Sequence, residues 1–379
     1  MTGVGVRDDG GATTAVRTGP VQDPVTALGR GVDEAQARTR DLLTAYLAER
    51  EATAGVLAPA YAALWASLAG QVGGRMMRPR LTAAAYLGLG GHDLRALAPV
   101  AAAQEVLHTA MLVHDDLLDH DESRRGRPNV AGAARVRLTS AGLVGQAVED
   151  QVLAAGVLGG DLALAAAFEL LAAAPVHASV RVDLVRLLAR GIGVTVAGEL
   201  LDMAGELLGP AEVDALRIAE LKTAVYSCCG PLTAGAVLAG APAELLTGLG
   251  RYGAALGIAF QLLDDELGVF GDEAVTGKSV LSDLREGKRT ELLRLTYRHT
   301  DAAGRRVLDA NVGRRDLDLA GADAVRAVMV DSSGLSRVRE VRARTVATAR
   351  DHATTALPSP LADYLVCLVD ELAGWEVGP

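Results

Sequence analysis

Two groups of paired aspartates are the residues whose type and spacing most directly suggest chemistry. One lies in residues 112–119 (LVHDDLLD) and the other in residues 260–267 (FQLLDDEL), and we predict both near the C-terminal end of a long apolar helix. Asp115 and Asp119 are four residues apart, so they share one helix face and repel each other. Carboxylates at this end also oppose the helix dipole. A solvated acidic helix end explains one such group equally well, whereas two groups favour a shared cation.

A ligand set made only of carboxylates favours a hard cation such as magnesium. Magnesium takes one or two carboxylates and completes its octahedron with water and phosphate oxygens. Two acidic helix ends that face each other would therefore hold a magnesium–diphosphate cluster. Its cations would neutralise a diphosphate leaving group and lower the barrier to breaking a C–O bond.

Basic residues before, between and after the two acidic groups could bind the oxygens of a diphosphate. Each of them alone is more simply a surface charge, and their arrangement around both groups is what favours a binding role. Lys222 stands out because it lies in an otherwise apolar helix, where an unpaired ammonium is costly. The candidates are Arg75, Arg78, Arg124, Arg125, Lys222, Lys278 and Lys288.

The composition excludes several classes of protein. A net charge of −10 argues against a nucleic-acid-binding protein, which normally has a basic domain. Three cysteines, two of them adjacent, give neither a disulfide framework nor metal-ligand spacing. Apolar runs such as residues 152–160 are interrupted by Asp161 well before the ~20 residues that a membrane span needs. We therefore predict no membrane span, and a cytoplasmic location.

The elements that must position these residues are predicted to be helices. Aromatic residues make up only 3% of the chain, and a core of alanine and leucine suits packed helices better than a sheet. No segment alternates with period two, which indicates an all-α protein. The expected helices include residues 33–51, 58–71, 96–119, 143–174, 180–207, 210–239 and 243–270.

The domain organisation is predicted to be simple. Residues 1–25 are rich in glycine, threonine and aspartate and lack the apolar segment of a signal peptide, so we expect a disordered tail. No long linker divides the rest, so residues 26–379 are expected to form a single domain.

Six segments, in order along the chain, resemble motifs of the all-trans isoprenyl diphosphate synthases, the polyprenyl synthetase family, and especially its bacterial geranylgeranyl diphosphate synthases. Residues 73–79 resemble the GGKRxRP motif, and residues 114–119 with 124–128 resemble the first aspartate-rich motif and its RRGxP tail. The other matching segments are residues 160–162, 222–224, 260–265 and 271–290. One DDxxD motif would be weak evidence, whereas six ordered matches argue against chance.

The resemblance implies a single large bundle of long antiparallel helices around a deep central cavity, usually as a homodimer. It also implies a reaction between isopentenyl diphosphate and an allylic prenyl diphosphate. Magnesium, with three ions per site, triggers loss of the allylic diphosphate, the double bond of isopentenyl diphosphate attacks the carbocation, and a proton leaves.

The resemblance assigns roles residue by residue. The magnesium ligands would be Asp115, Asp119 and Asp264, with Asp116 and Asp265 close by. The allylic diphosphate would be held by Arg124, Lys222, Gln261 and Lys278, and Lys288 also belongs to the predicted substrate site. Isopentenyl diphosphate would be held by Arg75, Arg78, His108 and Arg125. The reacting carbons would be lined by Thr223 and Phe260.

Six positions depart from the family's pattern. Arg75 stands where lysine is usual and Met76 where arginine is usual, while residues 129–131 (NVA) replace the common TVH. Glu199 stands where glutamine is common, and Gly268 occupies the last position of the second aspartate motif.

The length of the product is expected to depend on the helix that ends near Asp115. One isoprene unit is about as long as a helical turn, ~5 Å. Positions four, five and eight residues before Asp115 would therefore measure the pocket, and they are Met111, Ala110 and Leu107. Small Ala110 leaves the first turn open, flexible Met111 can yield, and Leu107 would form the floor. We expect a twenty-carbon product, geranylgeranyl diphosphate, although all three residues could simply be core residues.

Three other functions compete with this interpretation. A class I terpene cyclase shares the fold and the magnesium site but ionises a single prenyl diphosphate, and its cation-stabilising aromatic residues are scarce here. A metal phosphohydrolase of the His-Asp type would use His108, His114, Asp115 and a remote aspartate as ligands. A non-catalytic subunit of a hetero-oligomeric synthase would usually lack the aspartate groups, and both are present.

Overall fold

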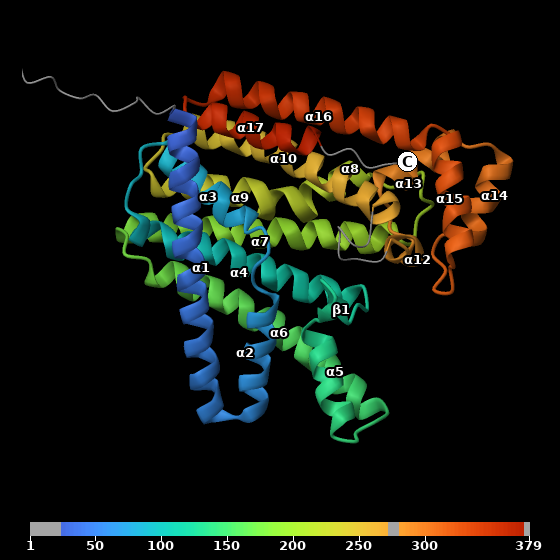
Figure 1. The fold of residues 1–379 in the computed structure, drawn as a ribbon, viewed down its shortest axis with the longest axis horizontal. Coiled ribbons are helices and arrows are strands. Elements are labelled where there is room, and N and C mark those ends of the chain that lie inside the picture. The colour runs from blue at the N-terminus through green and yellow to red at the C-terminus, as the bar shows by residue number, and fades with distance from the viewer. Residues whose placement is uncertain (1–23, 272–279, 375–379) are drawn as a thin grey trace, which may run out of the picture.

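Helices make up almost all of the chain that the computed structural model describes, residues 24–271 and 280–374 (Figure 1). The two strands in these residues have two residues each and pair antiparallel, Ser123 with Pro128 and Arg124 with Arg127. The elements are α1 (Pro24–Leu57), α2 (Pro59–Gln71), α3 (Met77–Gly88), α4 (Leu94–Leu118), β1 (Ser123–Arg124), β2 (Arg127–Pro128), α5 (Val130–Ser140), α6 (Gln146–Ala173), α7 (Ala178–Gly205), α8 (Ala215–Ile218), η1 (Ala219–Cys229), α9 (Gly230–Leu238), α10 (Ala243–Phe270), α12 (Ser282–Glu286), α13 (Glu291–His299), α14 (Ala302–Asn311), α15 (Leu319–Asp331), α16 (Gly334–Ala356) and α17 (Leu361–Ala373). The predicted all-α fold is confirmed.

Helix α4 lies at the centre of the bundle and is buried around most of its circumference. It packs against α6, α1, α3 and α9, and a helix that is apolar on every side belongs in such a core. Its start is fixed by Asp93, whose carboxylate accepts a hydrogen bond of 2.9 Å from the backbone N–H of Arg95. Figure 1 shows α4, α7, α10 and α16 running along a common direction, with α1 crossing them.

Most predicted helices match observed ones, with different ends. Helix α1 begins at Pro24, so Pro24 and Val25 are helical rather than part of the predicted tail. The other residues of that tail, 1–23, lie outside the described residues.

The predicted helix over residues 210–239 is wrong in detail. It divides into short α8, the π-helix η1 and α9. A π-helix bonds each residue to the fifth one along, and hydrophobic spacing does not reveal this change from the α-helical pattern.

Two helices in the described part of the chain are long and apolar enough to cross a membrane, by length and composition alone. These helices are α4 and α6. The most apolar 18-residue stretch of α4 is 83% buried inside the bundle, and that of α6 is 39% buried. A core helix such as α4 passes the same test. The absence of a membrane span and the deep central cavity stay predictions.

Candidate active site

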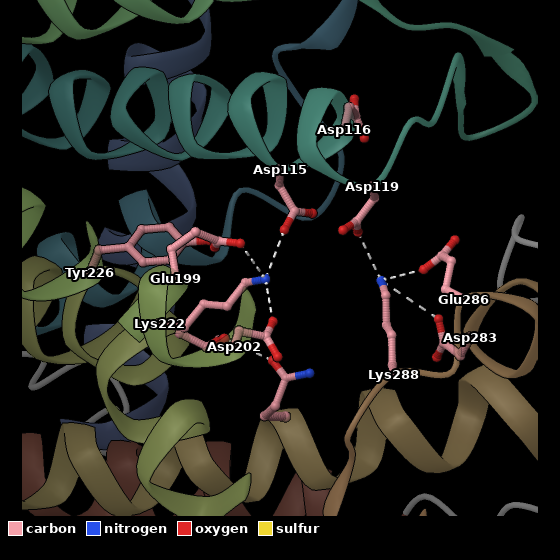
Figure 2. Close-up of polar contacts among 12 residues, drawn as sticks. Asp115, Asp116, Asp119, Glu199, Asp202, Lys222, Tyr226, Asp283, Glu286 and Lys288 are labelled. Carbon is pink, nitrogen blue, oxygen red and sulfur yellow. Dashed lines mark hydrogen bonds and ion pairs between the residues drawn. The ribbon is translucent and has the colours of Figure 1, made fainter. Parts of the chain in front are cut away.

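Lys222 of η1 faces the first acidic group from the opposite side of the bundle (Figure 2). Its Nζ lies 3.1 Å from Asp115 Oδ1 at the end of α4. The same ammonium is 3.0 Å from Glu199 Oε1 and 2.7 Å from Asp202 Oδ2, both on α7. An unpaired ammonium at Lys222 was expected to be costly in an apolar helix. In the structure, this ammonium has three carboxylate partners.

Lys288 makes a parallel arrangement with the other end of the acidic group. Its Nζ lies 3.1 Å from Asp119 Oδ2 and 3.2 Å from Glu286 Oε2, and 3.8 Å from Asp283 Oδ1 (Figure 2). Asp119 caps α4, whereas Asp283 and Glu286 belong to α12. The two lysines therefore face the two aspartates that were predicted as the main magnesium ligands on α4.

These ion pairs decide the charge states of the groups that form them. Burial alone would lower the pKa of Lys222, but Asp115, Asp202 and Glu199 together raise it above its ordinary value. Burial would raise the pKa of Asp115, but Lys222, Lys288 and Arg124 outweigh it and the pKa is lowered. Asp115 is therefore an ionised carboxylate, which is the form that a magnesium ion requires.

Asp116 points away from Lys222 and Lys288 (Figure 2). Its Oδ1 accepts a hydrogen bond of 2.8 Å from Nε of Arg124. Burial raises the pKa of Asp116 even though Arg124 opposes that shift. The structure thus uses Asp116 to hold Arg124, which also lies 3.5 Å from Asp115 Oδ2.

The hairpin that carries Arg124 and Arg125 is fixed by its backbone. Arg125 and Gly126 have φ angles of 54° and 70°, as a tight two-residue turn between strands demands. The buried Asn129 side chain donates to the backbone carbonyl of Asp121 at 2.7 Å and accepts from the N–H of Gly132 at 2.9 Å. The departure at Asn129 thus anchors the segment that presents the two arginines.

The second aspartate group, on α10, connects to η1 through hydrogen bonds. Thr223 donates to Oε1 of Gln261 at 2.9 Å, and Nε2 of Gln261 donates to Oδ1 of Asp265 at 2.7 Å. Burial raises the pKa of Asp265 to about 8, and the nearby charges of Asp283 and Asp264 add to this shift. Asp264 itself is exposed.

The glycine at position 268 is explained by its contact with Asp283. A Cβ atom added to it would lie 2.0 Å from Oδ2 of Asp283. The absent side chain therefore leaves room for Asp283, whose carboxylate takes up the space beside α10 where the family motif has an aspartate.

A separate basic cluster, composed of Arg78, His108 and Arg125, gathers around Tyr226 and Glu105. The Arg78 guanidinium lies 5.4 Å from the centre of the Tyr226 ring, and the ring of His108 stacks on Tyr226 at 5.9 Å. Burial raises the pKa of Glu105, whereas the charges of Arg78 and Arg125 act to lower it.

Sequence reasoning missed both Tyr226 and Glu105. Glu105 had a visible signal, since it is the acidic residue in the apolar run of α4 three residues before His108. Tyr226 had a weaker signal, as an aromatic residue four positions after Lys222 in a chain poor in aromatics.

Arg75 lies near residues of α1, α3 and α17. It is exposed and lines an open cavity of about 640 Å³ together with Asp33, Gln36, Arg80 and Glu371. Gln36 was not predicted, and its Nε2 donates to the backbone carbonyl of Met76 at 2.9 Å.

The departure at Met76 is a structural one. Its side chain is buried in the core beside Trp65 and Leu68, and its backbone has a φ of 49°. Arginine could not occupy this apolar site without an uncompensated charge.

The two histidines of the phosphohydrolase alternative contact different helices. His108 Nδ1 lies 3.3 Å from the Tyr226 hydroxyl, whereas His114 Nε2 lies 3.7 Å from Asp161 Oδ1 on α6. A Cβ on Gly160 would lie 2.0 Å from His114 Nε2, so the small residue at 160 makes room for that ring. His114 is placed as a packing residue, as the synthase interpretation requires.

The remaining predicted residues are placed as follows. Leu107 and Ala110 are buried and Met111 is partly buried, all within one apolar core cluster. Phe260 is partly buried against a second cluster. Lys278 lies in residues 272–279, outside the described residues.

The donor set fits magnesium with diphosphate. Within residues 24–271 and 280–374, no three His, Cys, Asp or Glu side chains are grouped closely enough to hold a metal by themselves. Asp115 and Asp119 of α4, and the acidic group of α10, instead offer one or two carboxylates from each helix. That number suits an ion that completes its shell with phosphate oxygens.

The chain is similar to known proteins in both sequence and fold. A family model described as polyprenyl synthetase matches residues 63–329. The chain is 34% identical over 275 residues to a (2E,6E)-farnesyl diphosphate synthase of Mycobacterium tuberculosis, which covers 72% of this chain and 70% of that one. It is also 34% identical over 315 residues to a geranylfarnesyl diphosphate synthase of Aeropyrum pernix, covering 78% and 91%.

A solved structure has the same fold over nearly its whole length. This is the geranylgeranyl pyrophosphate synthase from Corynebacterium glutamicum, complexed with isoprenyl diphosphate and magnesium. It matches with a TM-score of 0.84 and 29% identity, covering 90% of this chain and 99% of that one. These relatives favour a synthase over a cyclase or a phosphohydrolase.

The raised pKa of Asp265 predicts a pH-dependent stability. Its pKa is about 8 in the folded protein, against an ordinary value of 3.8 for an unfolded chain. The stabilisation that protonated Asp265 gives to the folded protein is fully present below its unfolded-state pKa. It is lost as pH rises through its folded-state pKa, because the unfolded chain binds fewer protons than the folded protein over this range. In a chelating buffer, the melting temperature of the wild type should fall between about pH 5 and pH 8, and Asp265→Asn should flatten that fall. Equal slopes for both proteins in a thermal-shift assay would contradict the prediction.

Proposed function

The chain belongs to the polyprenyl synthetase family of prenyltransferases, and from this premise we propose that it condenses isopentenyl diphosphate with an allylic prenyl diphosphate. One observation carries the proposal. Asp115 and Asp119 of α4 face Lys222 and Lys288 across the bundle, and the charge of Lys288 also acts on Asp265 of α10. This arrangement supplies both the carboxylates for a cation and the ammonium groups for an anion.

The residues of the ionisation step are proposed as follows. Asp115, Asp119 and Asp264 would hold magnesium, three ions per site, with Asp265 close by. Bound magnesium would neutralise the charge that develops on the leaving diphosphate. Lys222 and Arg124, now paired to Asp115 and Asp116, would donate to the diphosphate oxygens.

The second substrate would bind at the separate basic cluster. Arg78, Arg125 and His108, together with Arg75, would hold the diphosphate of isopentenyl diphosphate. Guanidinium groups suit this role because they bind two oxygens at once. Glu105 is buried close enough to Arg78 and Arg125 for both charges to act on its pKa.

The reacting carbons would lie between these two diphosphate sites. Thr223 and Gln261 are joined by a hydrogen bond of 2.9 Å, which fixes the orientation of both side chains where η1 meets α10. Phe260, the neighbour of Gln261 on α10, would line the same space.

The product is proposed to be geranylgeranyl diphosphate. Relatives of this chain carry the names of farnesyl, geranylgeranyl and geranylfarnesyl diphosphate synthases, so the family leaves the length open. Ala110, the residue five positions before Asp115, is too small to block the first turn of a tail pocket, and Leu107 would limit its depth.

A homodimer in the cytoplasm is part of the proposal. Helices α6 and α7 pack against each other and expose large apolar side chains that a second copy would cover. These include Leu153, Val157 and Leu158 on α6 and Val196 and Leu200 on α7.

The proposed reaction predicts a strict need for both substrates and for the aspartates of α4. With magnesium, an allylic diphosphate and isopentenyl diphosphate, the protein should form a longer prenyl diphosphate. Asp115→Ala and Asp119→Ala should each lower kcat by at least about 10³-fold, because each loses a ligand that acts as the leaving group gains charge. Both variants should keep the helical circular dichroism spectrum of the wild type.

Two controls accompany this assay. Asp41→Ala removes an exposed carboxylate of α1 and should retain wild-type turnover. Omission of isopentenyl diphosphate should abolish product formation, whereas a terpene cyclase would still convert the single diphosphate. Wild-type turnover by Asp115→Ala would end the assignment.

The two basic groups predict opposite effects on the two Michaelis constants. Arg75→Ala and Arg78→Ala should raise KM for isopentenyl diphosphate more than KM for the allylic substrate. Lys222→Ala should do the reverse, since its ammonium lies beside Asp115. Steady-state kinetics with each substrate varied in turn measures both constants, and equal effects would show that the partition of the sites is wrong.

The chain-length residues predict changes in the product itself. Ala110→Phe should shorten the product to fifteen carbons by filling the first turn of the pocket, and Leu107→Ala should lengthen it by removing the floor. Chromatography of the dephosphorylated products against standards separates these lengths. An unchanged product from Ala110→Phe would mean that the tail does not run along α4.

A further inference from the structure

The π-helix η1 carries Lys222 and Thr223 and is sandwiched between two α-helices. It runs from Ala219 to Cys229 and packs against α7 on one side and α10 on the other. Runs of π-helix are rare and occur most often at functional sites. The contacts that hold η1 in place therefore also determine where Lys222 and Thr223 lie.

On the side of α7, the contact is made by a glycine. A Cβ atom added to Gly198 would lie 2.3 Å from the backbone nitrogen of Lys222 and 2.7 Å from its Cα. These atoms belong to the backbone of η1, so no side-chain rotation could relieve the overlap. The next residue, Glu199, also pairs with the Lys222 ammonium. One turn of α7 therefore fixes both the backbone and the charged end of Lys222.

On the side of α10, a second glycine does the same for the neighbouring residues. A Cβ added to Gly257 would lie 2.4 Å from Cβ and 2.5 Å from Cα of Ala224. Gln261, one turn later on the same helix, accepts the hydrogen bond from Thr223. Helix α10 thus holds η1 through its backbone at Gly257 and through the Thr223 hydroxyl at Gln261.

Neither glycine is favoured by the helix in which it lies. Glycine in the middle of a helix is less stable than alanine there, because it loses more backbone freedom on folding. Helices α7 and α10 also contain glycines whose added Cβ would meet nothing within 4 Å, at Gly191 and Gly250. The close approach at Gly198 and Gly257 is therefore not shared by every glycine of these helices.

We propose that Gly198 and Gly257 are positioning residues, which clamp η1 from both sides and so set where Lys222 and Thr223 meet the allylic substrate. The inference rests on the proposed function and adds to it two residues that do not touch substrate. An added methyl group would push η1 away by about 1 Å, and a misplacement of that size in an active site can lower turnover by about 10²-fold.

The experiment compares four alanine variants in two matched pairs. Gly198→Ala and Gly257→Ala are the test variants. Gly191→Ala and Gly250→Ala are the controls, each seven residues earlier on the same helix, which places it on nearly the same face. All four substitutions add one methyl group and raise the intrinsic helix propensity by the same amount. Only the test pair brings that methyl group against η1.

The expected result is a selective loss in the test pair. Gly198→Ala and Gly257→Ala should raise KM for the allylic diphosphate about 10-fold or more and lower kcat by about 10²-fold. Their KM for isopentenyl diphosphate should change less than about 3-fold, and their circular dichroism spectra should match the wild type. The controls should keep wild-type constants. A folded Gly198→Ala with wild-type constants, or with equal rises in both KM values, would overturn the proposal.

Two further variants keep the test decisive if Gly198→Ala or Gly257→Ala does not fold. A Cβ on Gly253 would lie 2.9 Å from Cys229. Gly253→Ala should therefore also raise KM for the allylic diphosphate more than KM for isopentenyl diphosphate, but by a smaller factor. In the Gly257→Ala background, Ala224→Gly removes one of the two overlapping atoms and should recover part of the lost activity. A Gly253→Ala protein with unchanged constants, or no recovery from Ala224→Gly, would count against the clamp.

A binding measurement separates this proposal from the function on which it rests. Titration calorimetry with inorganic diphosphate and magnesium needs no turnover. Weaker binding by Gly198→Ala than by Gly191→Ala supports the clamp, whereas equal binding contradicts it. A wild-type protein that binds diphosphate but forms no prenyl product would refute the proposed reaction and leave the clamp standing.

Discussion

The concentration of negative charge between α4, α7, α10 and α12 is the constraint on which the rest of the site depends. Asp115, Asp202 and Glu199 gather at one point and Asp119, Asp283 and Glu286 at another, and such charges repel in a partly buried site. The described chain offsets this repulsion with Lys222 and Lys288, each placed within 4 Å of three carboxylates. The long helices of the bundle bring these groups together from distant parts of the sequence.

Close backbone contacts are what make this convergence possible. Gly160 admits the ring of His114, Gly268 admits the carboxylate of Asp283, and Gly198 admits the backbone of η1. Each of these glycines costs its helix about 1 kcal/mol relative to alanine. A chain whose apolar residues are mostly small can pack helices at such short distances, which explains why a protein so poor in aromatic residues forms a well-packed core.

Sequence reasoning predicted the parts of the site that carry charge and missed those that depend on which helices are neighbours. The paired aspartates and Lys222 were found because charges in apolar helices are conspicuous. Tyr226, Glu105 and Gln36 were missed because their roles come from contacts between helices, which hydrophobic spacing does not encode. The division of residues 210–239 was missed because an α-helical and a π-helical run have similar composition. The predicted roles of the site residues stay predictions.

The ion pairs of Lys222 and Lys288 also have a thermodynamic consequence. A cation that binds Asp115 and Asp119 must compete with two ammonium groups already beside them, and each displaced ammonium then needs a new anionic partner. A diphosphate supplies that partner. Under the proposed function, metal and substrate would therefore bind with positive cooperativity, each raising the affinity of the protein for the other by the same factor. Free magnesium alone would only replace one counterion of the aspartates by another, with little net gain in free energy.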